Sequence, residues 1–295
     1  MQTYHIKIDR TGREIDPHGT TAFPVAVYTT QIRKNLLGFI DWHWHQELQF
    51  CRVTCGEVEF QVESHTFYLR EGEGIFIAPG LLHRARNVPG TDSSYICLNY
   101  HPRLMQHANE SLIDRKYIDP YLNSAAGFCV LSPKISWQQE ILQQIIPLRN
   151  AFETEQPDYF SIYLQILHIW HLLYCHYLAA LPTGKQMPQN DTVHRIVAYI
   201  GRHYAEPIRL DELASSVDLA ESTCCRLFKK NMGCTIFEYI NNVRLLQSER
   251  LLLETELSVT EIAMQCGFGS ASYYNRNFKA KTRLSPRAYR QKFAE

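Results

Sequence analysis

Histidine, glutamate and glutamine occupy every second position of residues 43–49 (HWHQELQ). A strand over this segment has successive side chains on opposite sides, so five polar or thiol groups share one face: His43, His45, Glu47, Gln49 and Cys51. If that face lines a barrel, the interior is polar, which is unusual for a core and normal for a ligand pocket. Such groups can hydrogen-bond a small polar molecule or, as imidazole and carboxylate, bind a metal ion.

Basic side chains gather at the other end of the chain. The run from Arg276 to Lys292 contains seven Lys or Arg residues and no acid. Residues 187–295 carry 15 basic and 12 acidic residues, a net charge of +3, against −3 for residues 1–186. A basic stripe at one end of a chain is typical of a protein that binds a polyanion such as nucleic acid.

Two segments of this basic half repeat one pattern, Leu210–Lys230 and Val259–Lys281. Each starts with a short helical pattern that carries an apolar residue followed by alanine, at 213–214 and 262–263, where a second helix can cross closely. A turn follows at 217–219 and at 266–268, and then a helix that ends in Phe-Lys. Helix, tight turn and helix is the arrangement that presents a recognition helix to the major groove of DNA.

The segment between the repeats predicts one rigid connector. Residues 236–253 contain neither proline nor glycine, and as a helix they span roughly 27 Å. Successive major-groove openings on one face of B-DNA lie ~34 Å apart. One protomer could therefore place two recognition helices in adjacent turns of the duplex.

At about residues 192–291 the chain resembles the AraC/XylS family of transcriptional regulators. The second repeat carries most of the matching residues: Leu257-Ser258-Val259-Thr260-Glu261-Ile262-Ala263, Cys266-Gly267-Phe268, Tyr273-Tyr274, Arg276, Phe278-Lys279, Ser285-Pro286 and Tyr289-Arg290. The first repeat and the connector add Arg226-Leu227-Phe228-Lys229-Lys230, Gly233 and Tyr239-Ile240-Asn241. The match is specific because many spaced positions agree together.

The resemblance assigns base reading to the exposed faces of the two recognition helices. These positions are Ser222, Cys225 and Arg226 in the first helix, and Ser272, Tyr273, Asn275 and Arg276 in the second. Arginine can donate two hydrogen bonds to guanine, and asparagine can pair with adenine. The alternatives are a packing role for Tyr273 and structural ion pairs for the arginines. Ser270 can cap the second recognition helix and direct its first amides at a phosphate. In the first recognition helix, Ala220 stands where the family usually has a capping hydroxyl. Lys279 is expected to contact a phosphate.

The pattern of the first third of the chain predicts short strands separated by glycine residues. In residues 58–63 (VEFQVE), for example, apolar and polar residues alternate. A motif in this region is similar to the second motif of the cupin sensor domains found in many AraC-type regulators. It consists of Gly74, Pro79, Gly80, His83 and Asn87. The resemblance places His43, His45 and His83 at the histidine positions of cupin metal sites. Gln49 stands near the glutamate position, and a neutral amide is a poorer ligand, although Glu47 could substitute. We therefore expect no metal and no cofactor here, and instead a small polar effector, such as a sugar, bound by His43, His45, Glu47, Gln49 and His83.

These patterns predict an α+β multidomain chain. Residues 1–20 form an N-terminal arm that could serve as a lid, 21–135 a cupin-like barrel, and 136–180 helices for coupling or dimerisation. Residues 181–191 form a linker, and 192–295 the DNA-binding domain with two helix-turn-helix motifs. The apolar stripes of the middle helices, with Trp170 and Leu173, need burial, which a homodimer interface would supply.

Composition narrows the class of protein and the cellular compartment that we expect. The nine cysteines include no CxxC pair, which argues against a disulfide framework and a zinc ribbon. Residues 1–17 are polar and unlike a signal peptide. The longest uncharged stretch, 160–181, contains three histidines, which disfavours a membrane span. A cytoplasmic protein without a membrane partner is expected.

The sequence thus predicts a non-enzymatic transcriptional regulator that binds an operator in double-stranded DNA under the control of a small-molecule effector. RNA polymerase would be a further partner if the chain is an activator. Two alternatives stay open at this point. One is a metal-dependent cupin enzyme with an appended DNA-binding module, and the other is a regulator without a small-molecule effector.

Overall fold

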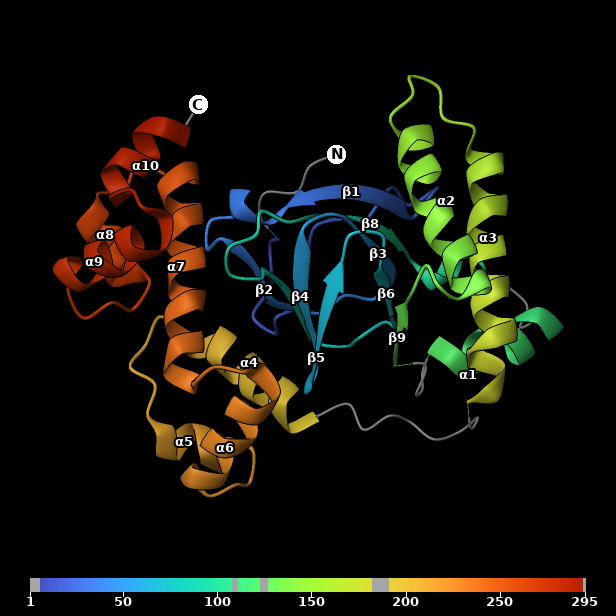
Figure 1. Cartoon of the computed structure of the whole chain (residues 1–295). Coiled ribbons are helices and arrows are strands. Elements are labelled where there is room, and N and C mark those ends of the chain that lie inside the picture. The colour runs from blue at the N-terminus through green and yellow to red at the C-terminus, as the bar shows by residue number, and fades with distance from the viewer. Residues whose placement is uncertain (1–5, 108–110, 123–126, 182–190, 294–295) are drawn as a thin grey trace.

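The computed structural model describes residues 6–107, 111–122, 127–181 and 191–293. Nine strands are followed by helices that fill the C-terminal part of the chain (Figure 1). The predicted linker falls almost wholly on 182–190, outside the described residues. Within the described ranges, no helix is both long and apolar enough to cross a membrane.

The strands form two antiparallel sheets. One sheet has the order β1-β8-β3-β6-β9, from Val25–Gln31, Ser94–Tyr100, Leu48–Cys55, Gly74–Ile77 and Phe128–Leu131. The other has the order β2-β7-β4-β5, from Phe39–His43, His83–Asn87, Glu57–Val62 and His65–Arg70. Among the described strands no ladder joins the two sheets, so the predicted barrel is an open pair of sheets.

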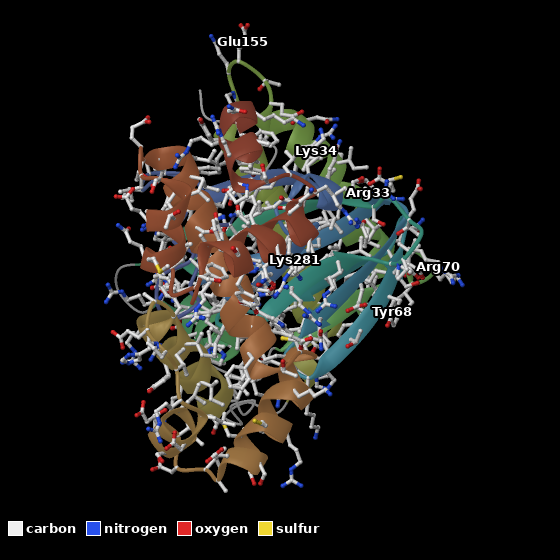
Figure 2. All side chains as sticks on the ribbon, turned by 90° about the vertical axis from the view of Figure 1, so that its left-hand side faces the viewer. Arg33, Lys34, Tyr68, Arg70, Glu155 and Lys281 are labelled. Carbon is white, nitrogen blue, oxygen red and sulfur yellow. The ribbon has the colours of Figure 1, made fainter. Side chains whose placement is uncertain are left out.

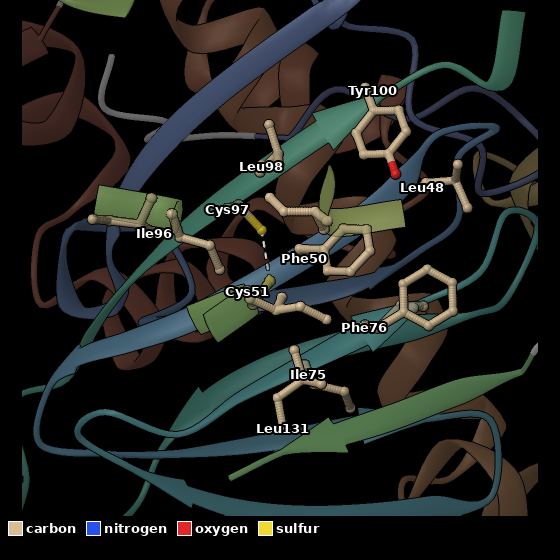
Figure 3. Close-up of a cluster of buried hydrophobic side chains, with 14 of the residues drawn as sticks. Leu48, Phe50, Cys51, Ile75, Phe76, Ile96, Cys97, Leu98, Tyr100 and Leu131 are labelled. Carbon is tan, nitrogen blue, oxygen red and sulfur yellow. Dashed lines mark hydrogen bonds between the residues drawn. The ribbon is translucent and has the colours of Figure 1, made fainter. Parts of the chain in front are cut away.

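A hydrophobic core lies between and beside these sheets. Side chains from β3, β6, β8 and β9 converge on one another in Figure 3, with Phe50 and Phe76 ring centroids 4.9 Å apart. Phe60 of the second sheet meets Tyr95 of the first at 5.2 Å. The strands β3, β6 and β8 of the first sheet are buried on both faces, because one face packs on the second sheet and the other lies under helices.

Two long helices, which the helical periodicity predicts, lie beside the first sheet. They are α2, Ser136–Phe152, and α3, Tyr159–His176, which lie side by side in Figure 1. Asp158 caps α3 through the amides of Phe160 and Ser161. Trp170 and Leu173 are buried in the chain's own core, and the Trp170 indole donates to the Tyr117 carbonyl at 3.2 Å. The expectation that these two residues need a dimer partner for burial is therefore wrong.

The C-terminal helices lie on the opposite side of the sheets (Figure 1). They are α4 Asp191–His203, α5 Leu210–Ser216, α6 Glu221–Met232, α7 Ile236–Glu254, α8 Val259–Gln265, α9 Ala271–Thr282 and α10 Pro286–Phe293. Capping boxes start α7 at Thr235 and α8 at Ser258, where each side chain accepts from the third helical amide and a glutamate reaches back. The helix-turn-helix pairs are α5-α6 and α8-α9, with α7 as the predicted connector.

Candidate functional site

The predicted strand over residues 43–49 is interrupted. His43 ends β2 in one sheet, and β3 in the other sheet begins at Leu48, so residues 44–47 form a connection rather than a strand. The single-face prediction was wrong for this reason. Three of the predicted ligand-binding side chains, those of His43, His45 and Gln49, are nevertheless buried together, because the connection turns back between the sheets.

Three histidines meet at this connection, and we call His43, His45 and His83 the histidine cluster. One ring nitrogen of each lies within 4.8 Å of one from each of the others, and all three residues are buried. Nδ1 of His43 lies 2.8 Å from the Asp41 carbonyl, and Nδ1 of His83 lies 2.8 Å from the Leu81 carbonyl. Because a carbonyl oxygen only accepts, both Nδ1 atoms carry the proton and both Nε2 atoms carry a lone pair.

His45 is held by its own neighbours. Its Nδ1 lies 3.2 Å from the Glu47 carbonyl, and its Nε2 lies 2.6 Å from the side-chain oxygen of Gln49. The Glu47 carboxylate is 3.6 Å from His45 Nδ1. Gln49 and Glu47 therefore both contact His45.

Two residues of the N-terminal segment, Glu14 and His18, also belong to the site, and the sequence does not predict either of them. The Glu14 carboxylate lies 3.2 Å from His18 Nε2 and 3.9 Å from His43 Nε2. Isolated backbone bridges hold the segment in place, between Ile8 and Glu14 and between Arg13 and Trp44. No spacing signal in the sequence connects Glu14 to His43, because the approach depends on how the segment folds over the sheets.

Burial disfavours the charged form of each histidine in the cluster. It lowers the pKa of His43 to about 4, and it also lowers the pKa values of His45 and His83. Burial acts to raise the pKa of Glu14, but its hydrogen bond with His18 and the nearby histidines outweigh this and lower it. The site thus combines the neutral imidazoles of His43 and His83 with one buried carboxylate, that of Glu14.

A small cavity of about 30 Å³ opens beside the cluster. Polar groups and a few rings line it, among them Glu14, His18, Tyr28, His43, Gln49, His83, Arg84 and Asn99. Nε2 of His83 and Oδ1 of Asn99 are buried there without a hydrogen-bond partner. Two of the predicted effector-binding residues do not line this cavity: His45, which belongs to the cluster, and Glu47, which contacts His45.

The first recognition helix, α6, presents Ser222 and Arg226 to solvent, while Cys225 is half-buried. Arg226 contacts Thr223 at 3.4 Å, and no carboxylate of the described residues lies within ion-pair distance of it. Ala220 takes the N-cap position and makes no side-chain hydrogen bond. This helix therefore begins without a side-chain cap, as the sequence predicts.

The second recognition helix, α9, starts on a side-chain cap. The Ser270 hydroxyl accepts from the Tyr273 amide at 3.2 Å. Ser272, Asn275, Arg276 and Lys279 are exposed on this helix. Tyr273 is 39% exposed and accepts a hydrogen bond from Asn241 of α7 at 3.1 Å, and the Arg276 guanidinium lies over its ring at 5.5 Å. Tyr273 thus has a packing contact as well as an exposed edge.

The sheets and the C-terminal helices share a packed interface. The Trp42 indole donates to the Met232 carbonyl at the end of α6, and Arg84 lies over the Trp42 ring at 4.9 Å. Gly233, at φ 61°, approaches Arg84 so closely that a Cβ there would lie 2.8 Å from Nη2. Lys281 of α9 lies over the Phe39 ring at 5.5 Å, in front of the strands in Figure 2. Both recognition helices therefore contact the sheet that carries His43 and His83.

Comparison with known proteins gives matches over both parts of the chain. A model of the AraC-like ligand binding domain matches residues 24–154, and a helix-turn-helix domain model matches residues 213–292. The uncharacterized HTH-type transcriptional regulator YdeC of Bacillus subtilis (strain 168) is 31% identical over 286 residues, which is 96% of this chain and 97% of the relative. The lactose operon transcription activator of Staphylococcus xylosus is 23% identical over 82% of this chain and 83% of its own. Among solved structures, fatty-acid-bound ToxT from Vibrio cholerae aligns with a TM-score of 0.42 at 15% identity, over 92% of this chain and 95% of ToxT.

Proposed function

This chain belongs to the AraC family of transcriptional regulators, and from that premise we propose how its two halves divide the work. The helices α6 and α9 read operator DNA, while the cavity beside the histidine cluster holds an effector. The observation that carries the proposal is the shared interface, in which one strand, β2, ends in a cavity residue, His43, and also contacts α6 through Trp42.

On the DNA side, the proposed base-reading groups are side chains of α6 and α9, all of them exposed except Cys225, which is half-buried. They are Ser222, Cys225, Arg226, Ser272, Tyr273, Asn275 and Arg276, with Ser270 and Lys279 directed at phosphate. The exposure of Arg226 and Arg276, together with the lack of ion pairs among the described residues, favours base reading over a structural role for both arginines. The Asn241 contact gives Tyr273 a share in positioning the helix.

On the effector side, the proposed ligand is a small polar molecule, for which a sugar or related metabolite is the class expected from the sequence. The proposed contacts are His43, His45, Glu47, Gln49 and His83, now joined by Glu14. The unpartnered His83 Nε2 supports this, because a buried nitrogen with a free lone pair needs a donor or a cation. Ligand binding would shift the population of interface arrangements and so alter DNA binding.

The chain is proposed to act without a catalytic step of its own, as its regulator relatives suggest. Catalysis at a metal centre, and regulation without an effector, are the competing possibilities. A cytoplasmic homodimer completes the proposal, with RNA polymerase as a further partner if the chain is an activator. Since Trp170 and Leu173 are internal, the dimer face would use exposed apolar residues of α3, such as Phe160, 69% exposed, and Leu164, 49% exposed. Sedimentation as a monomer at micromolar concentration, with and without effector, would contradict the dimer.

The test begins with DNA that the purified chain selects from a random duplex library. We expect the selected duplex to bind more tightly than random duplex in fluorescence anisotropy at one salt concentration. A thermal-shift screen of sugars and metabolites then identifies compounds that stabilise the chain, and the same compounds are added to the anisotropy assay. Equal affinity for selected and random DNA would refute sequence reading, and stabilising compounds that leave DNA affinity unchanged would refute effector control.

A further inference from the structure

A larger pocket lies where the sheet that carries His43 and His83 meets the C-terminal helices. Its volume is about 450 Å³, within the range of pockets that bind small molecules. Two cations, three amides and an aromatic ring are among the groups that line it: Arg86, Lys281, Asn241, Asn242, Asn277 and Phe39. We propose that this pocket binds a small polar anion, which bridges Arg86 of β7 and Lys281 of α9. The inference goes beyond the proposed function, whose effector lies between the two sheets.

The two cations of the pocket come from different halves of the chain and meet at one ring. Phe39 is the direct cross-strand partner of Arg86, and the Arg86 guanidinium lies 5.4 Å from the centre of its ring. The ammonium of Lys281, on α9 in front of the strands in Figure 2, lies 5.5 Å from the same centre. Nε of Arg86 is buried and has no hydrogen-bond partner. An anion between the two cations would pair with both and accept from this N–H group.

The carboxylates near these cations do not neutralise them by ion pairing. Within the described part of the chain, no carboxylate oxygen lies within 4.0 Å of Arg86 or Lys281. Glu59 is the cross-strand neighbour of Arg86 on β4, yet the two form no ion pair. Burial raises the pKa of Asp41 to about 6, and Arg86 and Lys281 both act against this rise. Both cations are therefore close enough to act on one acidic group, while neither has a carboxylate in contact.

One carboxylate, that of Glu238, lines the pocket, but it already has its partners. Its Oε2 accepts from the Thr235 amide at 2.7 Å and from the Thr235 hydroxyl at 2.9 Å. This capping box lies at the start of α7, where the helix dipole is positive and stabilises the carboxylate. Glu238 is thus held by its own helix, and Arg86 and Lys281 are left to bind an anion from solution.

The other walls of the pocket indicate a small polar ligand rather than a lipid. Only two lining side chains, those of Phe39 and Leu245, are hydrocarbon. The side-chain amide of Asn242 makes no hydrogen bond with the described residues, so its N–H groups can donate to a ligand. Carboxylate and phosphate groups both accept two hydrogen bonds from a guanidinium. The expected ligand is therefore a small metabolite that carries one of these groups.

An anion in the pocket would hold the second recognition helix to the sheet. Asn277 and Lys281 are four residues apart and so share one side of α9. Asn277 contacts Asn241 of α7 at 3.4 Å, while Arg276 and Lys279 are exposed. The anion would thus join α9 to β7 and leave the proposed base-reading side chains free for DNA.

The test uses the full chain in a buffer that contains neither phosphate nor carboxylate. Phosphate, succinate and glucose 6-phosphate are each titrated in by calorimetry, with uncharged succinamide and glucose as controls. We expect an anion site that binds neither control and that weakens in high salt. The relative affinities of succinate and phosphate show which acid group the site prefers. Arg86→Gln and Lys281→Gln should each weaken binding by about tenfold or more, because each removes a charged hydrogen-bond donor.

The matched control is Lys292→Gln, because Lys292 also lies over an aromatic ring, that of Phe293 at 5.1 Å, but does not line the pocket. Its anion affinity should stay within about twofold of the parent's. Arg86 belongs to the sheet, so Arg86→Gln separates this site from anion binding on the DNA-reading helices.

Hydrogen exchange of residues 271–282 is the second readout, and it should slow when an anion binds to the parent chain but not to Lys281→Gln. Thermal unfolding without ligand shows whether each variant is folded. Two results would overturn the inference: none of the three anions binds, or either pocket variant binds them as tightly as the parent. Neither readout involves DNA, so the loss of this site would leave the proposed function standing.

Discussion

The indole nitrogen of Trp42 donates a 2.9 Å hydrogen bond to the main-chain carbonyl of Met232, the last residue of recognition helix α6. Trp42 and Met232 are each 1% exposed, so this bond is shielded from water. The next residue along β2 is His43, whose side chain lines the cavity. Successive side chains of a strand point to opposite faces, so one short strand contacts the effector site on one face and α6 on the other.

Trp42→Phe should remove this donor and leave the buried Met232 carbonyl unpaired, which costs about 2 kcal/mol of the free energy of unfolding. Urea denaturation measures this loss. The variant should also respond less to a cavity ligand in the DNA anisotropy assay. Trp44→Phe is the matched control, since its bond to Thr11 lies at the exposed N-terminal segment. A Trp42→Phe chain with the parent's ligand response would exclude this bond from the coupling.

Arg276→Ala should weaken binding to selected DNA and relax preference at one base pair by about 1–3 kcal/mol. The guanidinium is exposed on α9, where it can donate to guanine. Anisotropy with single-base variants of the duplex, at one fixed salt concentration, measures both effects. Arg287→Ala, on the exposed face of α10, should weaken all duplexes alike. Unchanged affinity of Arg276→Ala for selected and random DNA would remove it from the reading surface.

The stability of the protein should change in opposite directions when the N-cap residues of the two recognition helices are exchanged between serine and alanine. Ser270→Ala removes the hydroxyl that accepts from the Tyr273 amide and should cost about 1 kcal/mol of stability. Ala220→Ser places a hydroxyl at an N-cap whose backbone is already extended, at φ −69° and ψ 146°, and should add up to about 1 kcal/mol. Chemical denaturation measures both, and a shift of the same sign in the two variants would contradict the capping argument.

The protein should lose stability as the pH falls from about 6.5 to 4. Burial lowers the pKa of His43 to about 4, so in this window the unfolded chain binds a proton that the folded chain does not. The loss from His43 is on the order of 3 kcal/mol, and the lowered pKa values of His45 and His83 act in the same direction. The raised pKa of His18 acts in the opposite direction. Denaturation series of the parent and His43→Gln should differ in slope across this window, and equal slopes would contradict the neutral state of His43.

Local sequence determined the C-terminal half. The apolar-alanine pairs at Leu213 and Ile262, the Ser270 cap and the Gly267 turn each act within a few residues, and the structure has the expected helices in order. Helix periodicity and capping depend on neighbours along the chain, so a pattern in the sequence is enough to predict them. Periodicity in the sequence is also enough to predict the helices α2 and α3, although it does not predict which part of the chain buries their apolar side chains.

Only the tertiary structure decided the site and its connection to α6. The break after His43 sends the chain into a second sheet, and the fold of the N-terminal segment brings Glu14 to His43. Trp42 meets Met232 across 190 residues. Contacts of this kind depend on how whole sheets and helices pack, and packing is set by the burial of many side chains together rather than by any local pattern. The sequence alone predicts that His43, His45 and His83 belong to one site, whereas it does not predict that the Glu14 carboxylate lies beside them.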